Sequence, residues 1–345
     1  MLEPKYRKTS MLDVARAADV SEATVDRVLN GRGGVSREKE ARVLECARKL
    51  NLDRALTTVS ARWLRIAIVM HRPYSPYHAQ VKEGIDYAQK VFEAQRIICV
   101  LTFFEGFKPS AIINTMKRAV ERADALVILC NEHPDVVAAV RRISQNIPVI
   151  ALSSDLPGSG RIAYVGPDNR AAGRVAGELM GRFLGEAGGE VLIITGLRDL
   201  LGHEERASGF GSVLSRSFPN CRIADILESR EQPEVTERFV RDSFKRIPDL
   251  RGIYVTSIGV EGVAEGLKAI KRAGSTIVIG HEFNEHTRRF LHEGVMHAVV
   301  DENPFNLAMR CVELVLRHYH RDPPLSYYRS LPVAIMLREN LPPTD

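Results

Sequence analysis

The sequence predicts a small all-helical domain followed by a two-lobed α/β domain built on doubly wound parallel sheets. The chain has 345 residues, more than the usual single domain of about 100–200 residues. Residues 13–31 read as two short helices with apolar residues at helical spacing. From Arg65 onward, continuous β-branched runs alternate with amphipathic segments. That alternation is typical of parallel sheets covered by helices on both faces.

Composition narrows the class of protein. The chain is 45% hydrophobic and 26% charged, as in ordinary globular proteins. It has no apolar run of roughly 18 residues and no apolar stretch of a secretory signal, so we expect no membrane segment and a cytoplasmic location. Its five cysteines are odd in number and never in C-x-x-C, so we expect free thiols. We expect neither a metal nor a cofactor.

Positive charge is concentrated at the start of the chain. Residues 1–62 hold 13 Lys and Arg against 9 Asp and Glu, whereas the remaining 283 residues hold 35 against 34. Such asymmetry favours a polyanionic partner for the first part of the chain alone, although surface lysines produce similar counts by chance.

Residues 1–50 are expected to fold as three helices. Ser10 caps the first helix with Asp13 as the acidic member of a capping box, and Ser21 caps the second. Asn30-Gly31 ends the second helix, because both residues tolerate a left-handed conformation. A third helix runs from Ser36 to about Leu50 and closes the core.

The body contains eight apolar runs that we assign to strands: 65–70, 96–104, 125–130, 147–152, 190–195, 252–257, 276–280 and 296–300. Helices are expected at 76–93, 109–122, 134–145, 168–186, 204–217, 233–246, 259–273 and 284–293. We place the helical domain at 1–50, a linker at 51–63 and the α/β domain at 64–345. Its lobes are expected at about 64–163 plus 296–325, and 164–295 plus 326–340.

The head resembles the helix-turn-helix of the LacI/GalR family of transcriptional regulators. That family's head reads D-V-A-x-x-A-x-V-S-x-x-T-V-S-R-V-L-N-G followed by V-S, and this chain has DVARAADVSEATVDRVLNG at 13–31 and Val35-Ser36. The stretches at 163–180, 203–210, 278–282 and 298–304 are similar to the family's effector domain, which is related to periplasmic sugar-binding proteins. The resemblance covers almost the whole chain.

The resemblance implies binding to double-stranded DNA. A helix-turn-helix places its second helix in the major groove, so Glu22 and Ala23 would read bases while Ser21, Thr24 and Arg27 hold the backbone. The full set of expected DNA-binding residues is Ser10, Ser21, Glu22, Ala23, Thr24, Asp26, Arg27, Asn30, Arg32 and Leu56.

Two positions depart from the family pattern. Asp26 stands where the family has serine, and an acid there repels phosphate unless it pairs with Arg27 or Arg32, or accepts from a cytosine amino group. The linker lacks the usual P-N and the hinge-helix residues, which leaves Leu56 as the candidate for insertion into the minor groove.

A small ligand is expected between the lobes, where the carboxyl ends of the strands face each other. The candidates are Tyr74, Tyr77, Glu132, His133, Arg206, Ser257, Glu282 and Glu302. Carboxylates that face an arginine suit vicinal hydroxyls, which favours a sugar or polyol. Asp168-Asn169 is interpreted as a helix cap outside the site.

The sequence therefore predicts a homodimeric regulator that binds a pseudo-palindromic operator, with affinity set by the effector. Two other functions stay open: a solute-binding protein that serves a transporter, and a sugar-processing enzyme with Glu132 and Glu282 as an acid–base pair. The chain carries no phosphate-loop, dinucleotide, nucleophile-elbow or zinc-protease motif. His318 and His320 point to different sides of a helix, which favours a surface role over metal binding.

Overall fold

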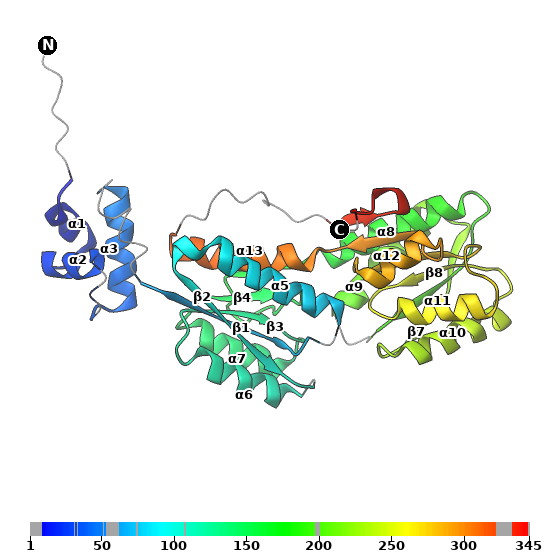
Figure 1. Cartoon of the computed structure of the whole chain (residues 1–345), viewed down its shortest axis with the longest axis horizontal. Helices are drawn as coiled ribbons and strands as arrows, with labels where there is room; N and C mark the ends of the chain where they lie inside the picture. Colours follow the sequence, from blue (N-terminus) through cyan, green and yellow to red (C-terminus); the bar gives the residue numbers. More distant parts are fainter. Residues whose placement is uncertain are drawn as a thin grey trace, which may run out of the picture.

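The computed structural model describes residues 9–30, 32, 34–50, 52, 62–73, 75–106, 108–196, 201–321 and 333–343. The predicted residues Leu56 and Tyr74, and most of the predicted linker, lie outside this part of the chain. A helical head and two α/β lobes follow one another in line (Figure 1). None of the described helices combines the length and the apolarity needed to cross a membrane.

The head consists of α1 (Met11–Ala18), α2 (Glu22–Leu29) and α3 (Arg37–Lys49). Ser10 and Asp13 form the predicted capping box on α1, and the Thr24 amide donates to the Ser21 hydroxyl at the start of α2 over 3.2 Å. The apolar faces of the three helices meet in a core of Val14, Ala15, Ala18, Val25, Val28, Leu29, Val43, Ala47 and Leu52. The helical period of these residues thus produces the three-helix packing.

The first lobe is a parallel five-stranded sheet of order β2-β1-β3-β4-β5. Its strands are β1 (Leu64–His71), β2 (Ile97–Phe104), β3 (Ala125–Leu129), β4 (Val149–Leu152) and β5 (Ala163–Val165). One face packs on α5 (Pro76–Val91) and α13 (Pro304–His318), the other on α6 (Pro109–Val120) and α7 (Pro134–Ser144). A short 3₁₀ turn, η1 (Glu93–Gln95), follows α5.

The second lobe is a six-stranded sheet of order β11-β10-β9-β8-β6-β7. Its strands are β6 (Gly189–Thr195), β7 (Cys221–Glu228), β8 (Leu250–Val255), β9 (Ile277–His281), β10 (Ala298–Asp301) and the antiparallel β11 (Ala334–Met336). Helices α8 (Asn169–Leu184) and α9 (Leu201–Ser217) cover one face. Helices α10 (Pro233–Arg246), α11 (Val260–Ala269) and α12 (Glu285–His292) cover the other, and η2 (Arg338–Asn340) follows β11. The predicted fold class is confirmed.

The chain crosses between the lobes at positions that correct the predicted boundaries. β5 extends the first sheet to Val165, and β10 pairs in parallel with β9 in the second sheet. The segment 296–325 is therefore divided, because β10 belongs to the second lobe and α13 to the first. An apolar run such as AVVD has the same pattern in either sheet, so the pattern does not identify its lobe.

Of the strands and α-helices in the described part of the chain, four are absent from the predicted set: β5, β7, β11 and α13. β5 and β11 have three residues each, too few for a recognisable pattern. β7 is an edge strand in which exposed Arg222 and partly exposed Asp225 interrupt the apolar residues. All five cysteines are free thiols, as predicted.

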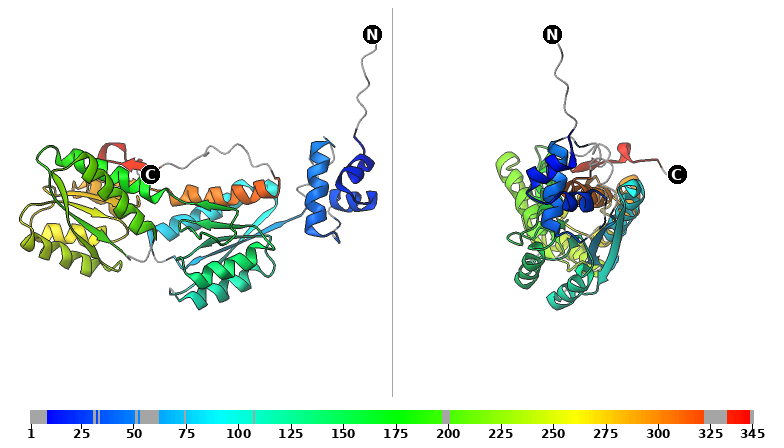
Figure 2. Two further views of the ribbon diagram at one scale, coloured as in Figure 1. Left: turned by 180° about the vertical axis from the view of Figure 1, so that it is seen from behind. Right: turned by 90° about the vertical axis from the view of Figure 1, so that its left-hand side faces the viewer.

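Two arginines join the head to the first lobe. Arg62 donates to Asp124 Oδ1 at 2.5 Å and lies 3.7 Å from Glu40 of α3. Buried Arg321, just after α13, donates to the carbonyl of Arg62 at 2.5 Å and to that of Arg96 at 3.2 Å. From behind, the head lies beyond the end of the first lobe that faces away from the second (Figure 2). The end of α13 is thus connected to the segment that carries the head.

Candidate functional site

Helix α2 presents a polar face to solvent. Ser21, Glu22, Ala23 and Arg27 are exposed, and Thr24 is partly exposed, because Val25, Val28 and Leu29 of the same helix are buried in the core. Of the other predicted DNA-binding residues, Ser10 is engaged in the α1 capping box, while Asn30 and Arg32 are exposed. The predicted contact residues of α2 therefore share one accessible surface.

Asp26, the departure from the family pattern, is held by two neighbours within the head. Its Oδ2 accepts from Arg32 at 2.9 Å and its Oδ1 accepts from the Asn30 side chain at 2.6 Å. The sequence allowed either Arg27 or Arg32 to pair with Asp26, and in the structure Arg32 makes the ion pair. The pair neutralises the acid on the helix surface, which reduces its repulsion of a nearby polyanion.

The body contains a cavity of about 450 Å³ between the two lobes, where the carboxyl ends of both sheets meet. Its polar lining residues include Ser75, Tyr77, His78, Glu132, Ser153, Asp155, Tyr164, Asp168, Asn169, His203, Glu205, Arg206, Glu231, Glu282 and Glu302. A cavity of this size suits a small molecule.

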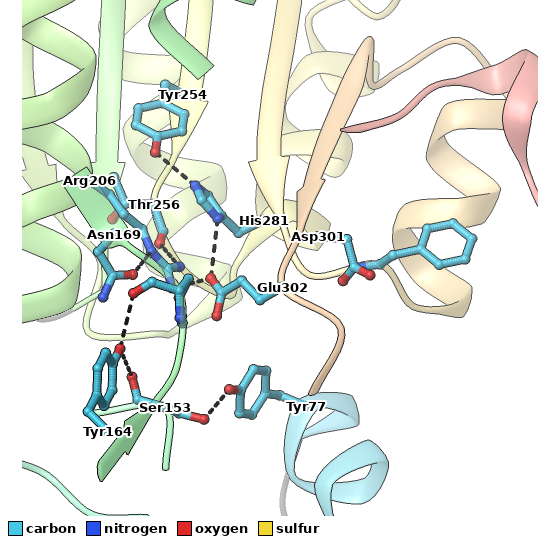
Figure 3. Close-up of polar contacts among 12 residues, drawn as sticks. Tyr77, Ser153, Tyr164, Asn169, Arg206, Tyr254, Thr256, His281, Asp301 and Glu302 are labelled. Carbon is cyan, nitrogen blue, oxygen red and sulfur yellow. Dashed lines mark hydrogen bonds and ion pairs between the residues drawn. The ribbon is translucent and has the colours of Figure 1, made fainter. Parts of the chain in front are cut away.

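Arg206 of α9 is the central cation of the cavity wall (Figure 3). Its side chain is buried, and each guanidinium nitrogen has its own acceptor. Nε donates to Asn169 Oδ1 at 2.8 Å, Nη1 donates to the Thr256 carbonyl at 2.9 Å, and Nη2 forms an ion pair with Glu302. The start of helix α8 and the ends of β8 and β10 thus fix the guanidinium in one orientation.

Glu302 follows β10, and its environment favours the ionised carboxylate. Burial opposes ionisation, but the charge of Arg206 and the neighbouring His281 together hold the pKa of Glu302 below its usual value. Burial and Arg206 lower the pKa of His281 to about 4, so this imidazole is neutral at pH 7. Its Nε2 lies 2.8 Å from the Tyr254 hydroxyl, which fixes the ring from behind.

The first lobe contributes phenol and hydroxyl groups. The Tyr77 hydroxyl is hydrogen-bonded to the Ser153 hydroxyl, and the Tyr164 hydroxyl donates to the carbonyls of Ser153 and Pro167 at 3.0 and 3.1 Å. Burial, followed by the charge of Glu302, raises the pKa values of both phenols, so they remain neutral hydrogen-bonding groups at pH 7.

Five of the predicted effector-binding residues line the cavity: Tyr77, Glu132, Arg206, Glu282 and Glu302. His133 and Ser257 are not among the lining residues. The His133 ring caps α7 by accepting from the Asp135 amide, and buried Ser257 donates to the Ile258 carbonyl. Both side chains, which were predicted to contact the effector, are instead engaged in hydrogen bonds to residues close by in the chain.

Asp168, Asn169 and Glu231 line the cavity although the sequence did not predict them as effector-binding residues. Asp168 caps α8, as predicted, by accepting from the Ala171 amide at 2.8 Å. Both Asp168 and Asn169 nevertheless line the cavity, which corrects their exclusion from it. Glu231 follows β7, and recognition of that strand in the sequence would have identified it by the same rule that selected Glu282 and Glu302.

Glu282 has a different environment from Glu302. Its backbone is left-handed, with φ of +66°, and its Oε2 is buried without a hydrogen-bond partner among the described residues. Burial and the nearby charge of Glu302 raise the pKa of Glu282 to about 8. Between pH 4.5 and 8 the folded protein therefore binds more protons at this carboxyl than the unfolded chain, so rising pH lowers stability.

We expect Glu282→Gln to remove this loss of stability with rising pH, because the amide cannot ionise. At pH 8.5 the variant should exceed the wild type in free energy of unfolding by on the order of 2–4 kcal/mol, whereas the two should converge near pH 4.5. Urea unfolding across this pH range measures the difference. The exposed control Glu186→Gln should follow the wild-type curve, and equal slopes for all three proteins would contradict the environment assigned to Glu282.

Family models match both parts of the chain. The model of bacterial regulatory proteins of the lacI family matches residues 10–53, and that of the periplasmic binding protein domain matches residues 66–320. The ribose operon repressor of Halalkalibacterium halodurans is 23% identical over 342 residues, or 96% of each chain. The D-ribose/D-allose-binding protein of Pseudomonas aeruginosa is 23% identical over 266 residues, which is 73% of this chain and 81% of that one.

A solved structure shares the fold of the body. The solute-binding protein of an ABC transporter from Burkholderia graminis, in complex with D-arabinose, has a TM-score of 0.72 and 22% identity, and the match covers 80% of this chain and 96% of that one. The head and the body are thus each matched where the structure places them. The chain belongs to the lacI family of bacterial regulatory proteins, and it is a DNA-binding transcriptional regulator whose body is a periplasmic binding protein domain.

Proposed function

We propose that this regulator binds a pseudo-palindromic operator as a homodimer in the cytoplasm, and that a small polyhydroxylated effector between the lobes sets its affinity. The observation that carries the proposal is the combination, in one chain, of a lacI head and an interlobe cavity with the buried Arg206–Glu302 pair. The guanidinium and carboxylates offer donors and acceptors suited to hydroxyls. Relatives described as a ribose operon repressor and a D-ribose/D-allose-binding protein support this ligand class.

A homodimer follows from the size of the head. The base-reading face of α2 spans two turns, and one such face buries too little surface for operator-level affinity. Two heads related by a two-fold axis double the contacts and require two half-sites of inverted sequence. Selection of bound fragments from a random duplex pool tests this directly. Paired half-sites are expected, and enrichment of no sequence above non-specific binding would contradict the proposal.

Replacement of Arg27 should weaken binding to all DNA sequences. Arg27 is exposed on α2 and is expected to neutralise a phosphate, so Arg27→Ala should lower affinity by a similar factor on operator and random DNA, and should reduce the salt slope by about 1. Glu22→Gln should instead change the selected bases. Fluorescence anisotropy across salt concentrations measures both, with Arg182→Ala in the body as the control. Identical effects of Arg27→Ala and Glu22→Gln on every sequence would contradict this division of roles.

Helix α13 offers a physical connection from the cavity to the head. It begins two residues after Glu302, and Arg321 beyond its end holds the carbonyl of Arg62, whose side chain lies near Glu40 of α3. An effector that binds one lobe arrangement more tightly shifts the population toward that arrangement. We propose that α13 then displaces the segment that carries the head and changes the spacing of the two heads on the operator.

We propose binding without turnover for the cavity. The acid–base pair considered for a glycosidase combines Glu132, which is exposed at the wall, with Glu282, which is partly buried. The matched family models describe a regulatory and a binding domain, which supports a role in recognition. Recovery of a bound ligand unchanged after long incubation is the expected result, and its hydrolysis would favour the enzyme instead.

A further inference from the structure

The wall of the interlobe cavity carries an excess of acidic side chains. Among its described lining residues are seven carboxylates and a single guanidinium, that of Arg206. The carboxylates are those of Glu132, Asp155, Asp168, Glu205, Glu231, Glu282 and Glu302. This imbalance exceeds what the recognition of neutral hydroxyls requires, because a hydroxyl donor is satisfied by a carbonyl or amide oxygen as well as by a carboxylate.

Three of these carboxylates already have partners in the protein. Glu302 forms the ion pair with Arg206, Asp155 forms a two-point ion pair with Arg161, and Asp168 caps α8. All three nitrogens of Arg206 are engaged, so its positive charge is matched by Glu302. No cation is left in the described wall to neutralise a further acid, except through the lining histidines.

Four carboxylates remain without an ion pair to any described residue: Glu132, Glu205, Glu231 and Glu282. Glu282, Glu231 and Glu205 are all partly buried, and burial raises the pKa of the first two, which are therefore the carboxylates to consider. The Oε2 atom of Glu282 is buried without a hydrogen-bond partner in the described part of the chain. Such an orphaned buried oxygen is costly unless a ligand completes it.

The backbone holds these two carboxylates at the cavity in a strained conformation. Glu282 and Glu231 have left-handed φ values of +66° and +59°. A Cβ at Gly196 would lie 2.6 Å from the Ser257 hydroxyl oxygen and 3.1 Å from Glu231 Oε1, so the glycine leaves space beside both side chains. Strain of this kind in non-glycine residues persists at ligand-binding positions because the surrounding structure imposes it.

The groups that face Glu282 are mostly acidic. Glu302, Glu231 and Asp301 disfavour its negative charge, and Arg206 alone favours it. Burial likewise raises the pKa of Glu231. The imidazole of His78, which also lines the cavity, supplies no charge at pH 7, because burial and His71 lower its pKa to about 4. A positive charge brought by a ligand would therefore be stabilised by two carboxylates at once.

The positive charge that would balance Glu282 and Glu231 is better supplied by an organic cation than by a metal ion. Among the described residues, no group of three or more His, Cys, Asp or Glu side chains is arranged to hold a metal ion. An ammonium group needs fewer and less closely gathered acceptors, since it offers three separate N–H donors on one charge. The rest of the wall, with Arg206, Asn169 and the Tyr77 and Tyr164 hydroxyls, suits the hydroxyl groups of the same molecule.

We propose that the effector is a small hydroxylated amine, an amino sugar or amino polyol, whose ammonium group lies between Glu282 and Glu231 while its hydroxyls contact Arg206 and Asn169. This inference rests on the proposed function, because it takes the cavity as the effector site. It goes further by assigning a positive charge to the ligand. In this proposal Glu282 is the residue that makes the site prefer an amine to a neutral sugar.

Isothermal titration calorimetry on the full chain at pH 7 tests the assignment with matched compounds. The pairs are D-glucosamine with D-glucose, D-galactosamine with D-galactose, and glucamine with sorbitol, together with the N-acetylated form of each amine. In at least one pair the amine should bind about tenfold or more tightly than the neutral parent and the N-acetyl form. Glu282→Gln should reduce this ratio to about 2 or less, whereas the exposed control Glu186→Gln should keep it.

Proton release provides a second readout that a purely structural role of Glu282 would not change. An ammonium that binds beside Glu282 favours its ionised form, so binding at pH 7 should release up to about one proton. Titrations in phosphate and in MOPS, which differ in ionisation enthalpy, count that proton. The release should disappear in Glu282→Gln.

The outcomes separate the two proposals. Binding of a neutral parent as tightly as, or more tightly than, its amine in every pair that binds would overturn the assignment of charge and leave the sugar-binding function in place. A selectivity for amines that survives in Glu282→Gln would overturn the role of that residue. Binding of no compound in any pair would overturn both this inference and the proposed effector class.

Discussion

Arg206→Met should lower the free energy of unfolding by about 3–5 kcal/mol and abolish effector binding. The substitution leaves the buried carboxylate of Glu302 without its charge partner and the Thr256 carbonyl without the donor 2.9 Å away. Breaking a buried ion pair from one side is costly, because the remaining charge stays desolvated. Urea unfolding at pH 7 measures the loss.

The pH dependence and a double variant identify the cause. Without Arg206, Glu302 should favour its protonated form, so Arg206→Met should regain stability as the pH falls toward 5. The double variant Arg206→Met with Glu302→Gln should recover most of the loss at pH 7. Arg182→Met, which breaks an exposed pair with Glu178, should cost less than about 0.5 kcal/mol. A double variant no more stable than Arg206→Met would show that the buried charge is not the cause.

Gly209→Ala should destabilise the second lobe by about 3 kcal/mol, although alanine is the better helix former. A Cβ at Gly209 would lie 2.2 Å from the carbonyl oxygen of Arg170 on α8, which is impossible without separating the two helices. The same close approach occurs at Gly173, where a Cβ would lie 2.0 Å from the Arg206 carbonyl oxygen. Separation of α8 from α9 would also move Arg206 away from Asn169.

Gly211→Ala is the matched control, since it makes the same change two residues further along α9. A Cβ at Gly211 meets only the end of the Ile223 side chain, at 3.1 Å. The free energy of unfolding should therefore stay unchanged or rise by up to about 1 kcal/mol. Thermal and urea unfolding of both variants measure the contrast, and similar values for the two would contradict the packing described for these helices.

The sequence predicted the fold well where a local pattern decides the structure. The caps at Ser10 and Ser21 and the buried stripe of Val25, Val28 and Leu29 depend on residues a few positions apart, and all are found in the head. Membership of a sheet depends instead on contacts that are distant in the chain. β10 was therefore placed in the wrong lobe, and the edge strand β7, whose apolar residues are interrupted by charged ones, was missed.

The cavity residues could likewise be predicted only where a local sequence pattern identifies them. Arg206, Glu282 and Glu302 could be selected because they match the family stretches or follow apolar strands, and all three line the cavity. Asn169 could not be selected, because its sequence context indicates a helix start and its contact with Arg206 spans 37 positions. Its buried role becomes visible only when α8 and α9 are packed together.

The central claim is that the cavity controls the head, and operator affinity measured with and without an effector tests it most directly. The probe is the compound that binds most tightly in the calorimetric panel, used with the operator recovered from the duplex pool at one fixed salt concentration. For the wild type we predict that a saturating concentration changes the operator Kd by about tenfold or more, which corresponds to a coupling free energy of about 1.4 kcal/mol or more. In Arg206→Met the compound should leave the operator Kd unchanged. An operator Kd that is the same with and without the bound compound in the wild type would contradict the claim.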